Sequence, residues 1–393
     1  MKKPKSESLI QALDMTYEGT YPIPTEGPDF GTKDLAEGGQ ALSLHPGGQS
    51  MYFGCHSPMM YARVSTPSAE SPSRLLEECQ YVPEEPGGGS HLGGTLTYGE
   101  KIITSKYVFY DGSGLALTSH QFDDGLGFSP LLRVGDLNPG FYGGYMGLVP
   151  PDYVDKLGPA FTGQGILSII GRTSSGPAAF GFNPADLGVK NPVPAIPWLY
   201  YTVENPLHDP NVQNELFTRA DRLAGAFFVP GTSTFLFVGH HGMGVPCYGM
   251  GTSEQPPPPS YCYNPMDGAQ GEHAYPYRGQ VWAYDVNDFL AVIAGEILPW
   301  EVRPYAVWAL PGVSQTEYRV RRGGCAFDPV TGRVFVAKDF GTHPELDVFK
   351  IPMNKPPDPP DPEPEPPLTG EVVAIRRLPG GKLSITIVIS HSK

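Results

Sequence analysis

The chain has 393 residues, of which 40% are hydrophobic and 11% aromatic, so it is long enough for one large all-β domain or two ordinary domains. Its 27 basic and 41 acidic residues give a formal net charge of -14. A field of that sign repels phosphate backbones and anionic lipid surfaces, so composition disfavours a nucleic-acid-binding protein.

No apolar run approaches the roughly 20 residues of a membrane helix, so no membrane insertion is expected. Residues 1–14 are polar and are predicted to form an N-terminal arm. Their basic start is not followed by a hydrophobic segment, so no secretory signal peptide is predicted. We therefore expect a protein kept in the host cytoplasm before assembly, or one carried in a virion that is released by lysis.

The first strand is expected at residues 15–21, and a pattern of strand, proline turn and second strand then recurs. In three copies the second strand starts five residues after the proline, which is Pro46, Pro230 or Pro329. This common offset predicts hairpins of equal register. A weaker copy ends at Pro184, which lies 46 residues before Pro230.

A period of roughly 46 to 50 residues made of short strands is typical of a β-propeller, whose blades are four-stranded sheets. The predicted fold is therefore all-β, a β-propeller over residues 15–351 with about seven four-stranded blades, or six if the long loops are discounted. Pairing of residues 347–351 with residues 15–21 would close the ring and remove exposed sheet edges. Residues 285–295 have an N-cap, helical spacing and a final glycine, which predicts a short helix.

Residues 352–367 are rich in proline and acidic residues, which predicts an extended linker. Residues 368–393 contain two alternating runs around a Pro-Gly-Gly turn, which predicts a C-terminal β-hairpin. A hairpin of that size is not stable alone, so we expect it to anchor the chain to a partner in an oligomeric assembly. The expected anchoring residues are Val372, Val373, Ile375, Leu383, Ile385, Ile387 and Ile389.

Polar and aromatic residues are concentrated between two predicted strands, residues 235–238 and 279–284. A rigid sheet often presents binding or catalytic groups on such a loop. Together with histidines that follow other predicted strands, these residues are expected to line the top of the central channel. The candidate ligand-binding residues are His56, His120, His240, His241, His273, Tyr275, Tyr277 and Arg278.

Two interpretations of these histidines remain open. They could hold a divalent metal, or act as acid and base near neutral pH. Alternatively, hydrogen-bonded His and Tyr side chains tie the long loops to the sheets, and then no metal or other cofactor is required. The adjacent carboxylates Asp123 and Asp124 would point to opposite sides of a strand, which is weak evidence for a glycosidase pair.

The 5 cysteines include no CxxC spacing, so neither a zinc ribbon nor a redox pair is predicted. Cys247 and Cys262 flank the proline-rich residues 255–260 and could close this excursion as a disulfide. The alternative is that the cysteines are small buried residues, reduced in a cytoplasm.

Four segments resemble the uncharacterised β-propeller proteins of bacteria and their phages: residues 17–24, 239–241, 272–277 and 280–285. The resemblance covers residues 15–351 and implies the propeller fold, but it brings no activity with it. More distantly, the chain is similar to propeller polysaccharide lyases, which use His, Tyr and Arg at the axial cleft, sometimes with a metal.

The leading hypothesis is a non-enzymatic virion protein, such as a phage fibre, decoration or tail-associated component. Its propeller would bind a surface glycan or a neighbouring subunit, and residues 352–393 would attach it to other assembly proteins. The alternative is a carbohydrate-active enzyme, either a polysaccharide lyase or a hydrolase, and a third is an intracellular scaffold for a host protein. The enzyme would need a base, an acid and a cation for a uronate carboxylate, taken from His241 or His273, Tyr275 or Tyr277, and Arg278.

Overall fold

The computed structural model divides the chain into two compact units, Met1–Met353 and Asn354–Lys393. The structure describes residues 9–24, 35, 38–55, 59–69, 71–84, 90–108, 111–165, 171–252, 261–318, 324–338, 344–353, 369–377 and 383–390. The candidate residue His56, the proline-rich residues 255–260 and most of the linker lie outside the described residues, as do residues 166–170.

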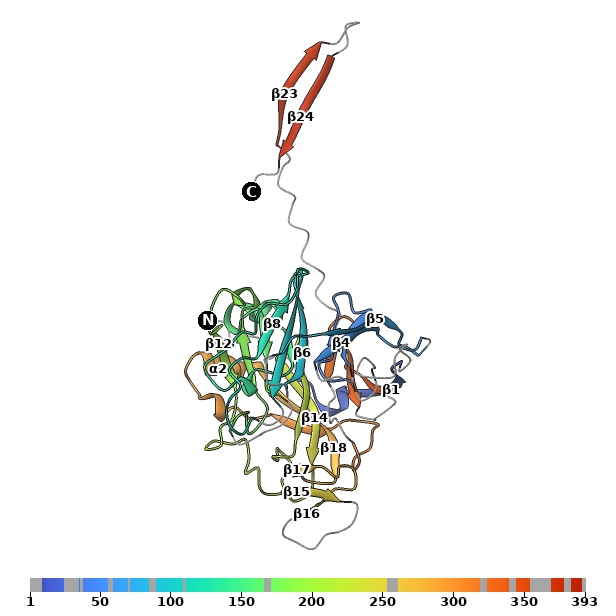
Figure 1. Ribbon diagram of the computed structural model, residues 1–393, viewed down its shortest axis with the longest axis vertical. Coiled ribbons are helices and arrows are strands. Elements are labelled where there is room, and N and C mark those ends of the chain that lie inside the picture. The colour runs from blue at the N-terminus through green and yellow to red at the C-terminus, as the bar shows by residue number, and fades with distance from the viewer. Residues whose placement is uncertain are drawn as a thin grey trace. The chain divides into compact units, whose positions relative to one another are not determined.

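In the first unit, antiparallel sheets follow one another along the chain (Figure 1). Sheet 1 contains β2 (Ser43–Leu44), β3 (Ser50–Gly54), β4 (Met60–Ser65) and β5 (Leu75–Tyr81). Sheet 2 contains β6 (Ser90–Tyr98), β7 (Lys101–Val108) and β8 (His120–Asp123). Sheet 3 contains β9 (Met146–Leu148), β10 (Ala160–Thr162), β11 (Ala179–Phe182) and β12 (Ala195–Leu199).

Sheets 4 and 5 complete this series. Sheet 4 contains β13 (Arg222–Phe228), β14 (Thr234–Gly242), β18 (Tyr277–Asp285) and β19 (Ala306–Ala309). Between β14 and β18 the chain forms a separate excursion sheet of β15 (Cys247–Thr252), β16 (Tyr261–Tyr263) and β17 (Gln270–His273). Sheet 5 contains β20 (Cys325–Asp328), β21 (Arg333–Lys338), β22 (Glu345–Lys350) and the N-terminal β1 (Thr16–Pro22).

Helices are short in the described part of the chain. The α-helices are α1 (Val154–Leu157) and α2 (Val286–Ile293). The 3₁₀ helices are η1 (Ala12–Asp14), η2 (Pro139–Phe141), η3 (Pro151–Tyr153), η4 (Pro184–Asp186) and η5 (Pro299–Glu301). The predicted helix is confirmed as α2. The Asp285 side chain caps this helix by accepting a hydrogen bond from the backbone N–H of Asn287. No helix among the described residues has the length and apolar character needed to cross a membrane.

The predicted closing pair is confirmed, since β1 runs antiparallel to β22 with Thr16 opposite Lys350. The three proline hairpins are also confirmed, as β2–β3, β13–β14 and β20–β21. The weaker copy that ends at Pro184 differs from the other three, because its strand is not the first of a sheet. It contains β11, which is the third strand of sheet 3 and pairs with β10 and β12.

This difference changes the number of repeats. Within the described residues, the first unit has five sheets in the series, where the sequence predicted six or seven. The interval from Pro230 to Pro329 holds the rest of sheet 4 together with the excursion sheet, and not two blades. Insertions within sheet 4, which include the excursion sheet, lengthen this repeat to twice the expected period.

The first strands of the five sheets contact one another in a closed series. β2 contacts β6, β6 contacts β9, β9 contacts β13, β13 contacts β20, and β20 contacts β2. Glycines allow this approach: a Cβ added to Gly93 would lie 1.8 Å from the carbonyl oxygen of Gly143, and one added to Gly225 would lie 2.8 Å from that of Cys325. Larger side chains at these points would force the strands apart.

The second unit contains the predicted hairpin, formed by β23 (Thr369–Arg377) and β24 (Leu383–Ser390). Its antiparallel ladder pairs Val372 with Ile387 and Ile375 with Ile385. A register shift between Val372 and Ala374 inserts one extra residue into β23.

Two disulfides are present, Cys247–Cys262 and Cys55–Cys79, and Cys325 is a buried free thiol. The first pair was one of the two alternatives left open by the sequence, and the second was not anticipated. The alternative of five reduced cysteines is therefore wrong. Cys55 directly follows β3 and Cys79 lies on β5, and the pairing of sheet 1 brings their Cα atoms to 6.2 Å from each other.

Candidate functional site

The long connections of sheet 4 leave from one end of that sheet. Arg222, at the start of β13, pairs with His240 near the end of β14, and His240 pairs with Gly279 near the start of β18. Residues 200–221 and residues 243–276 therefore enter and leave the sheet at the same end.

The other first strands begin near this same place. A cavity of about 10 Å³ is lined by Ala41, Leu92, Tyr145 and Leu223, which lie at or near the starts of four first strands. We call this side of the first unit the loop end. The cavity has room for about one water molecule.

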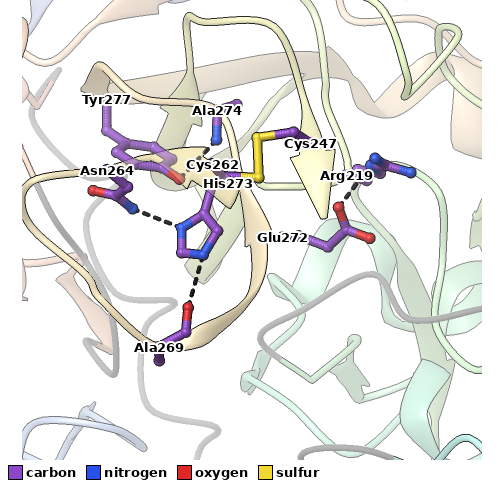
Figure 2. The surroundings of a disulfide bond; sticks show 9 residues. All are labelled: Arg219, Cys247, Cys262, Asn264, Ala269, Glu272, His273, Ala274 and Tyr277. Atoms are coloured by element: carbon purple, nitrogen blue, oxygen red, sulfur yellow. Dashed lines mark hydrogen bonds and ion pairs between the residues drawn. A yellow bond between two sulfur atoms is a disulfide. The ribbon is translucent and has the colours of Figure 1, made fainter. Parts of the chain in front are cut away.

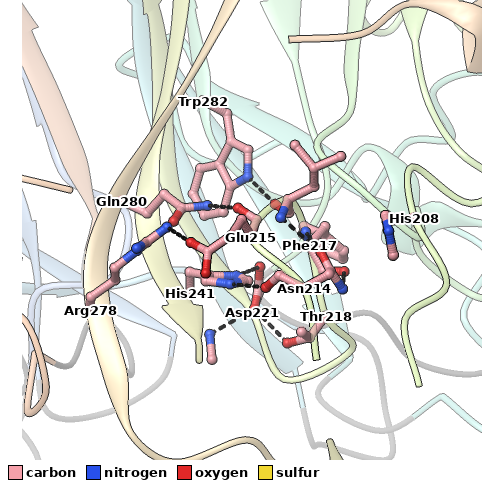
Figure 3. A network of polar contacts seen from close by, with 12 residues as sticks. His208, Asn214, Glu215, Phe217, Thr218, Asp221, His241, Arg278, Gln280 and Trp282 are labelled. Atoms are coloured by element: carbon pink, nitrogen blue, oxygen red, sulfur yellow. Dashed lines mark hydrogen bonds and ion pairs between the residues drawn. The ribbon is translucent and has the colours of Figure 1, made fainter. Parts of the chain in front are cut away.

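Both ring nitrogens of His241 face acceptors (Figure 3). The residue is 0% exposed, its Nδ1 lies 2.7 Å from Oδ2 of Asp221, and its Nε2 lies 2.8 Å from the carbonyl oxygen of Asn214. A ring that donates from both nitrogens is positively charged. These contacts favour the charged imidazolium form of His241, paired with the carboxylate of Asp221.

The Asp221 carboxylate has two further hydrogen-bond donors besides His241. It accepts hydrogen bonds from the Thr218 hydroxyl at 2.6 Å and from the backbone N–H of Gly242 at 2.9 Å. Burial alone lowers the pKa of His241, but the charge and hydrogen bond of Asp221 outweigh burial and raise this pKa above its ordinary value. An imidazole with both nitrogens engaged has no free position for a metal or for a substrate proton.

The same network fastens residues 211–221 to sheet 4. The Trp282 indole N–H donates to the carbonyl oxygen of Leu216 at 2.6 Å, and the Arg278 guanidinium donates to the Glu215 carboxylate at 2.7 Å. Arg278 also donates from Nε to Gln280 at 2.9 Å. The contacts of His241 and Arg278 therefore hold a long connection against its sheet.

His273 has a comparable role in the excursion (Figure 2). It is buried, its Nδ1 lies 2.8 Å from the Asn264 side-chain nitrogen, and its Nε2 lies 2.9 Å from the carbonyl oxygen of Ala269. These partners fix the neutral tautomer that carries its proton on Nε2. His273 therefore ties the connection between β16 and β17 to β17.

The candidate tyrosines lie near each other at the loop end. The Tyr277 hydroxyl accepts a hydrogen bond from the backbone N–H of Ala274 at 2.9 Å, and burial raises the pKa of this tyrosine. Its ring lies 4.9 Å from that of His240. Tyr275 is half-buried and packs edge-on against Tyr263 at 5.5 Å.

The structure does not bring all the candidates together. His240, His241, Tyr277 and Arg278 lie side by side on β14 and β18, whereas His273 lies on the excursion sheet. His120 is on sheet 2, where burial lowers its pKa to about 3 and its ring packs against Phe182. Within the described residues, no group of three or more His, Cys, Asp or Glu side chains is arranged to hold a metal.

The excursion sheet has two different faces. The strand β15 alternates, with Tyr248 and Met250 exposed and the intervening glycines Gly249 and Gly251 buried. The buried side carries the Cys247–Cys262 disulfide, and a Cβ added to Gly251 would lie 1.7 Å from the carbonyl oxygen of Asp267. The other side exposes 51% of Tyr248, 43% of Met250 and 37% of Tyr263. We call these three residues the tyrosine surface.

An ion pair holds the tyrosine surface against the rest of the loop end. Arg219 Nε lies 2.7 Å from Glu272 Oε2, and Glu272 pairs with Tyr248 across β15 and β17. Figure 2 shows Glu272 and His273 pointing to opposite sides of the strand. Burial raises the pKa of Glu272, although the charge of Arg219 opposes this effect.

Asp221, Asn214 and the tyrosine surface were not among the site residues predicted from the sequence. Asp221 and Asn214 lie in a connection without periodicity, and only folding places them beside His241. The tyrosine surface had a readable signal, since the run Cys-Tyr-Gly-Met-Gly-Thr alternates large and small residues with the period of a strand.

No family model and no curated protein matches the sequence. By structure, the chain is similar to a candidate glycoside hydrolase from Parabacteroides distasonis, at a TM-score of 0.42 and 9% identity over 82% of this chain and 88% of that one. It is also similar to a luciferin-regenerating enzyme (TM-score 0.36, 8% identity, 86% and 98% covered) and to a DUF4221 family member from Bacteroides vulgatus (0.36, 7%, 89% and 100%). Likeness at this level carries no inference about activity or ligand.

Proposed function

We propose that the first unit is a five-bladed β-propeller that binds a glycan at its loop end and performs no catalysis. The closed series of contacts among the first strands of five sheets supports this architecture. Pairing of β1 with β22 supports it as well, because one sheet then contains both ends of the propeller chain.

The observation that carries the binding proposal is the tyrosine surface. Tyrosine rings offer a large rigid contact area at low entropic cost, and their hydroxyls remain available to the hydroxyls of a sugar. The disulfide, the buried glycines and His273 hold this surface in one conformation. A preorganised surface loses less conformational freedom when it binds.

The absence of catalysis is proposed because the candidate acid and base groups are engaged elsewhere. His241 and His273 use both ring nitrogens in hydrogen bonds within the protein, and the pKa of Tyr277 is raised by burial. A general base needs an acceptor that can reach a substrate proton. These side chains are better suited to fixing loops than to turnover.

We further propose that the second unit anchors the protein to a particle such as a virion. Directly paired positions share one face of a hairpin, so the ladder and its bulge place positions 370, 372, 375 and 377 with positions 383, 385, 387 and 389. Six of these eight are aliphatic in the sequence, and the other two are Gly370 and Arg377. A two-stranded ribbon cannot cover such a face by itself, so a partner must supply the cover. The disulfides suit a protein exposed on a virion or cell surface.

Glycan-array screening followed by calorimetry tests the binding proposal. We expect Tyr248→Ala to weaken binding of the best glycan by about tenfold or more. Tyr81→Ala is the matched control, because Tyr81 is 54% exposed on sheet 1, close to the 51% of Tyr248. Equal loss in both variants, or turnover of the glycan by the wild-type protein, would contradict the proposal.

The anchoring proposal has its own test in the full-length chain. Ile385→Asp with Ile387→Asp places two charges on the aliphatic face of the hairpin. We expect the variant to lose incorporation into particles while its glycan affinity stays unchanged. The matched control is Ser384→Asp with Thr386→Asp, at alternate positions of the same strand. Normal incorporation of the isoleucine variant would argue against the anchor.

A further inference from the structure

A second cavity lies between sheets 2 and 3, and none of its lining residues belongs to the tyrosine surface. Its volume is about 20 Å³, and its lining includes Lys106 of β7, Gly140 of η2, and Arg172 and Thr173 in the connection between β10 and β11. That connection is held near η2 by the Asn138 side chain, which donates to the carbonyl oxygen of Gly171 at 3.4 Å. The cavity is therefore formed by elements from two different sheets.

The guanidinium of Arg172 has no hydrogen bond or ion pair in the described structure, and its Nε atom is buried. It packs closely over the turn at residues 111–114. A Cβ added to Gly114, whose φ is +66°, would lie 2.7 Å from Cζ of Arg172. Withdrawing a donor from water without an acceptor costs free energy, and a bound acceptor would offset this cost.

The described lining of the cavity includes charged side chains of both signs. Lys106 is a second cation there and is 3% exposed. The lining has one carboxylate, that of Asp111. One of its oxygens accepts a hydrogen bond from the backbone N–H of Leu115 at 2.8 Å.

We propose that this cavity binds one small oxyanion group, either a carboxylate or a phosphate or sulfate. The planar guanidinium can donate two parallel hydrogen bonds to such a group. The oxyanion supplies the acceptor that Arg172 lacks. This proposal concerns a site distinct from the tyrosine surface and does not depend on glycan binding there.

Calorimetry and thermal unfolding of the full chain, at constant ionic strength, test this site with three probes against chloride. Sodium glucuronate represents a carboxylate, and inorganic phosphate and sulfate represent the tetrahedral anions. We expect at least one probe to bind and to raise the Tm, and the ranking of the three identifies the class. Arg172→Gln should weaken that binding about tenfold or more. Arg74→Gln, which removes an exposed arginine outside the cavity, is the charge-matched control and should bind as the wild type does.

A second readout separates binding from a structural role. Without any oxyanion, we expect Arg172→Gln to have a Tm equal to or above that of the wild type, because the change removes an unpaired, partly buried charge. A lower Tm in chloride would show that Arg172 stabilises the fold, and this would overturn the proposal. So would the absence of binding by all three probes, or unchanged binding in both Arg172→Gln and Lys106→Met.

Discussion

The excursion sheet is inserted in the chain between two strands of sheet 4, yet the two sheets differ in how far their side chains are exposed to solvent. All nine positions of β14 are buried. Both ring nitrogens of His241 and both carboxylate oxygens of Asp221 lie within hydrogen-bond distance of a partner. A few residues later, β15 exposes Tyr248 and Met250 at alternate positions. The first region is a closed hydrogen-bond network, and the second presents a surface.

The difference shows how to separate structural polar groups from binding groups in this protein. A histidine in a conspicuous motif is a poor indicator of chemistry when both of its nitrogens are engaged within the fold. An exposed aromatic side chain held by a disulfide is a better one, since nothing in the described first unit covers it. The following predictions test that contrast by its effect on the free energy of unfolding.

The largest effect is expected at Asp221. Asp221→Ala leaves a buried imidazolium without its partner, so we expect a loss of about 3 to 5 kcal/mol in the free energy of unfolding at pH 7. Urea denaturation measures it. Asp221→Asn is the control, because an amide nitrogen can donate to Nδ1 of a neutral His241, and it should lose clearly less. Equal losses in the two variants would mean that charge pairing is unimportant here.

Removal of the excursion disulfide should come next. Replacing Cys247 and Cys262 together by serine opens a loop that spans a sequence separation of 15. For a loop of this length we expect the free energy of unfolding to fall by about 3 kcal/mol. The loss should be confined to the excursion sheet, so hydrogen exchange should accelerate at β15 to β17 and stay slow at β14. Faster exchange in both sheets would show that they unfold as one unit.

The dependence of the free energy of unfolding on pH should be a smaller effect, and the raised pKa of His241 sets its sign. The pKa of His241 is raised in the folded state, so its stabilising effect is complete below the unfolded value of about 6.5 and is lost as pH rises through the folded pKa. The urea midpoint of the wild type should therefore fall as pH rises above about 6.5. In Asp221→Asn this fall should be absent. Parallel curves for the two proteins would refute a charged His241.

The smallest effect is expected on the tyrosine surface. Tyr248→Ala and Met250→Ala should each change the free energy of unfolding by less than about 0.5 kcal/mol, because both side chains are exposed. The same urea experiment measures them. A loss above about 1.5 kcal/mol in either variant would mean that the surface is part of a core, and it would weaken the case for a binding role.

Local sequence signals predicted much of the secondary structure. The proline hairpins, the cap and terminal glycine of α2, the C-terminal hairpin and the pairing of β1 with β22 all follow from short patterns or from the need to close a ring. The number of sheets could not be counted in this way. The excursion sheet inserts its own strands between β14 and β18, and an insertion is indistinguishable from further repeats when only spacing is known.

The candidate site was predicted in position but not in character. The sequence directed attention to residues 235–284, where the network and the tyrosine surface both lie. It placed His240 and His241 in a loop, whereas they belong to β14, because glycine-flanked histidines resemble loop residues. It could not show that Arg172 and Lys106 line one cavity, since Arg172 lies in the connection between β10 and β11 and Lys106 lies on β7.

By itself the sequence determined the all-β class, the hairpin registers and the separate C-terminal hairpin, because alternation, proline and glycine act on neighbouring residues. Tertiary structure alone decided which polar groups are satisfied. Asp221 reaches His241 across 20 residues of aperiodic chain, and the acceptors of His273 lie in a loop fixed by other strands. Hydrogen-bond satisfaction depends on distances between segments remote in sequence, and it is this property that distinguishes the closed network from the exposed surface and the unpaired arginine.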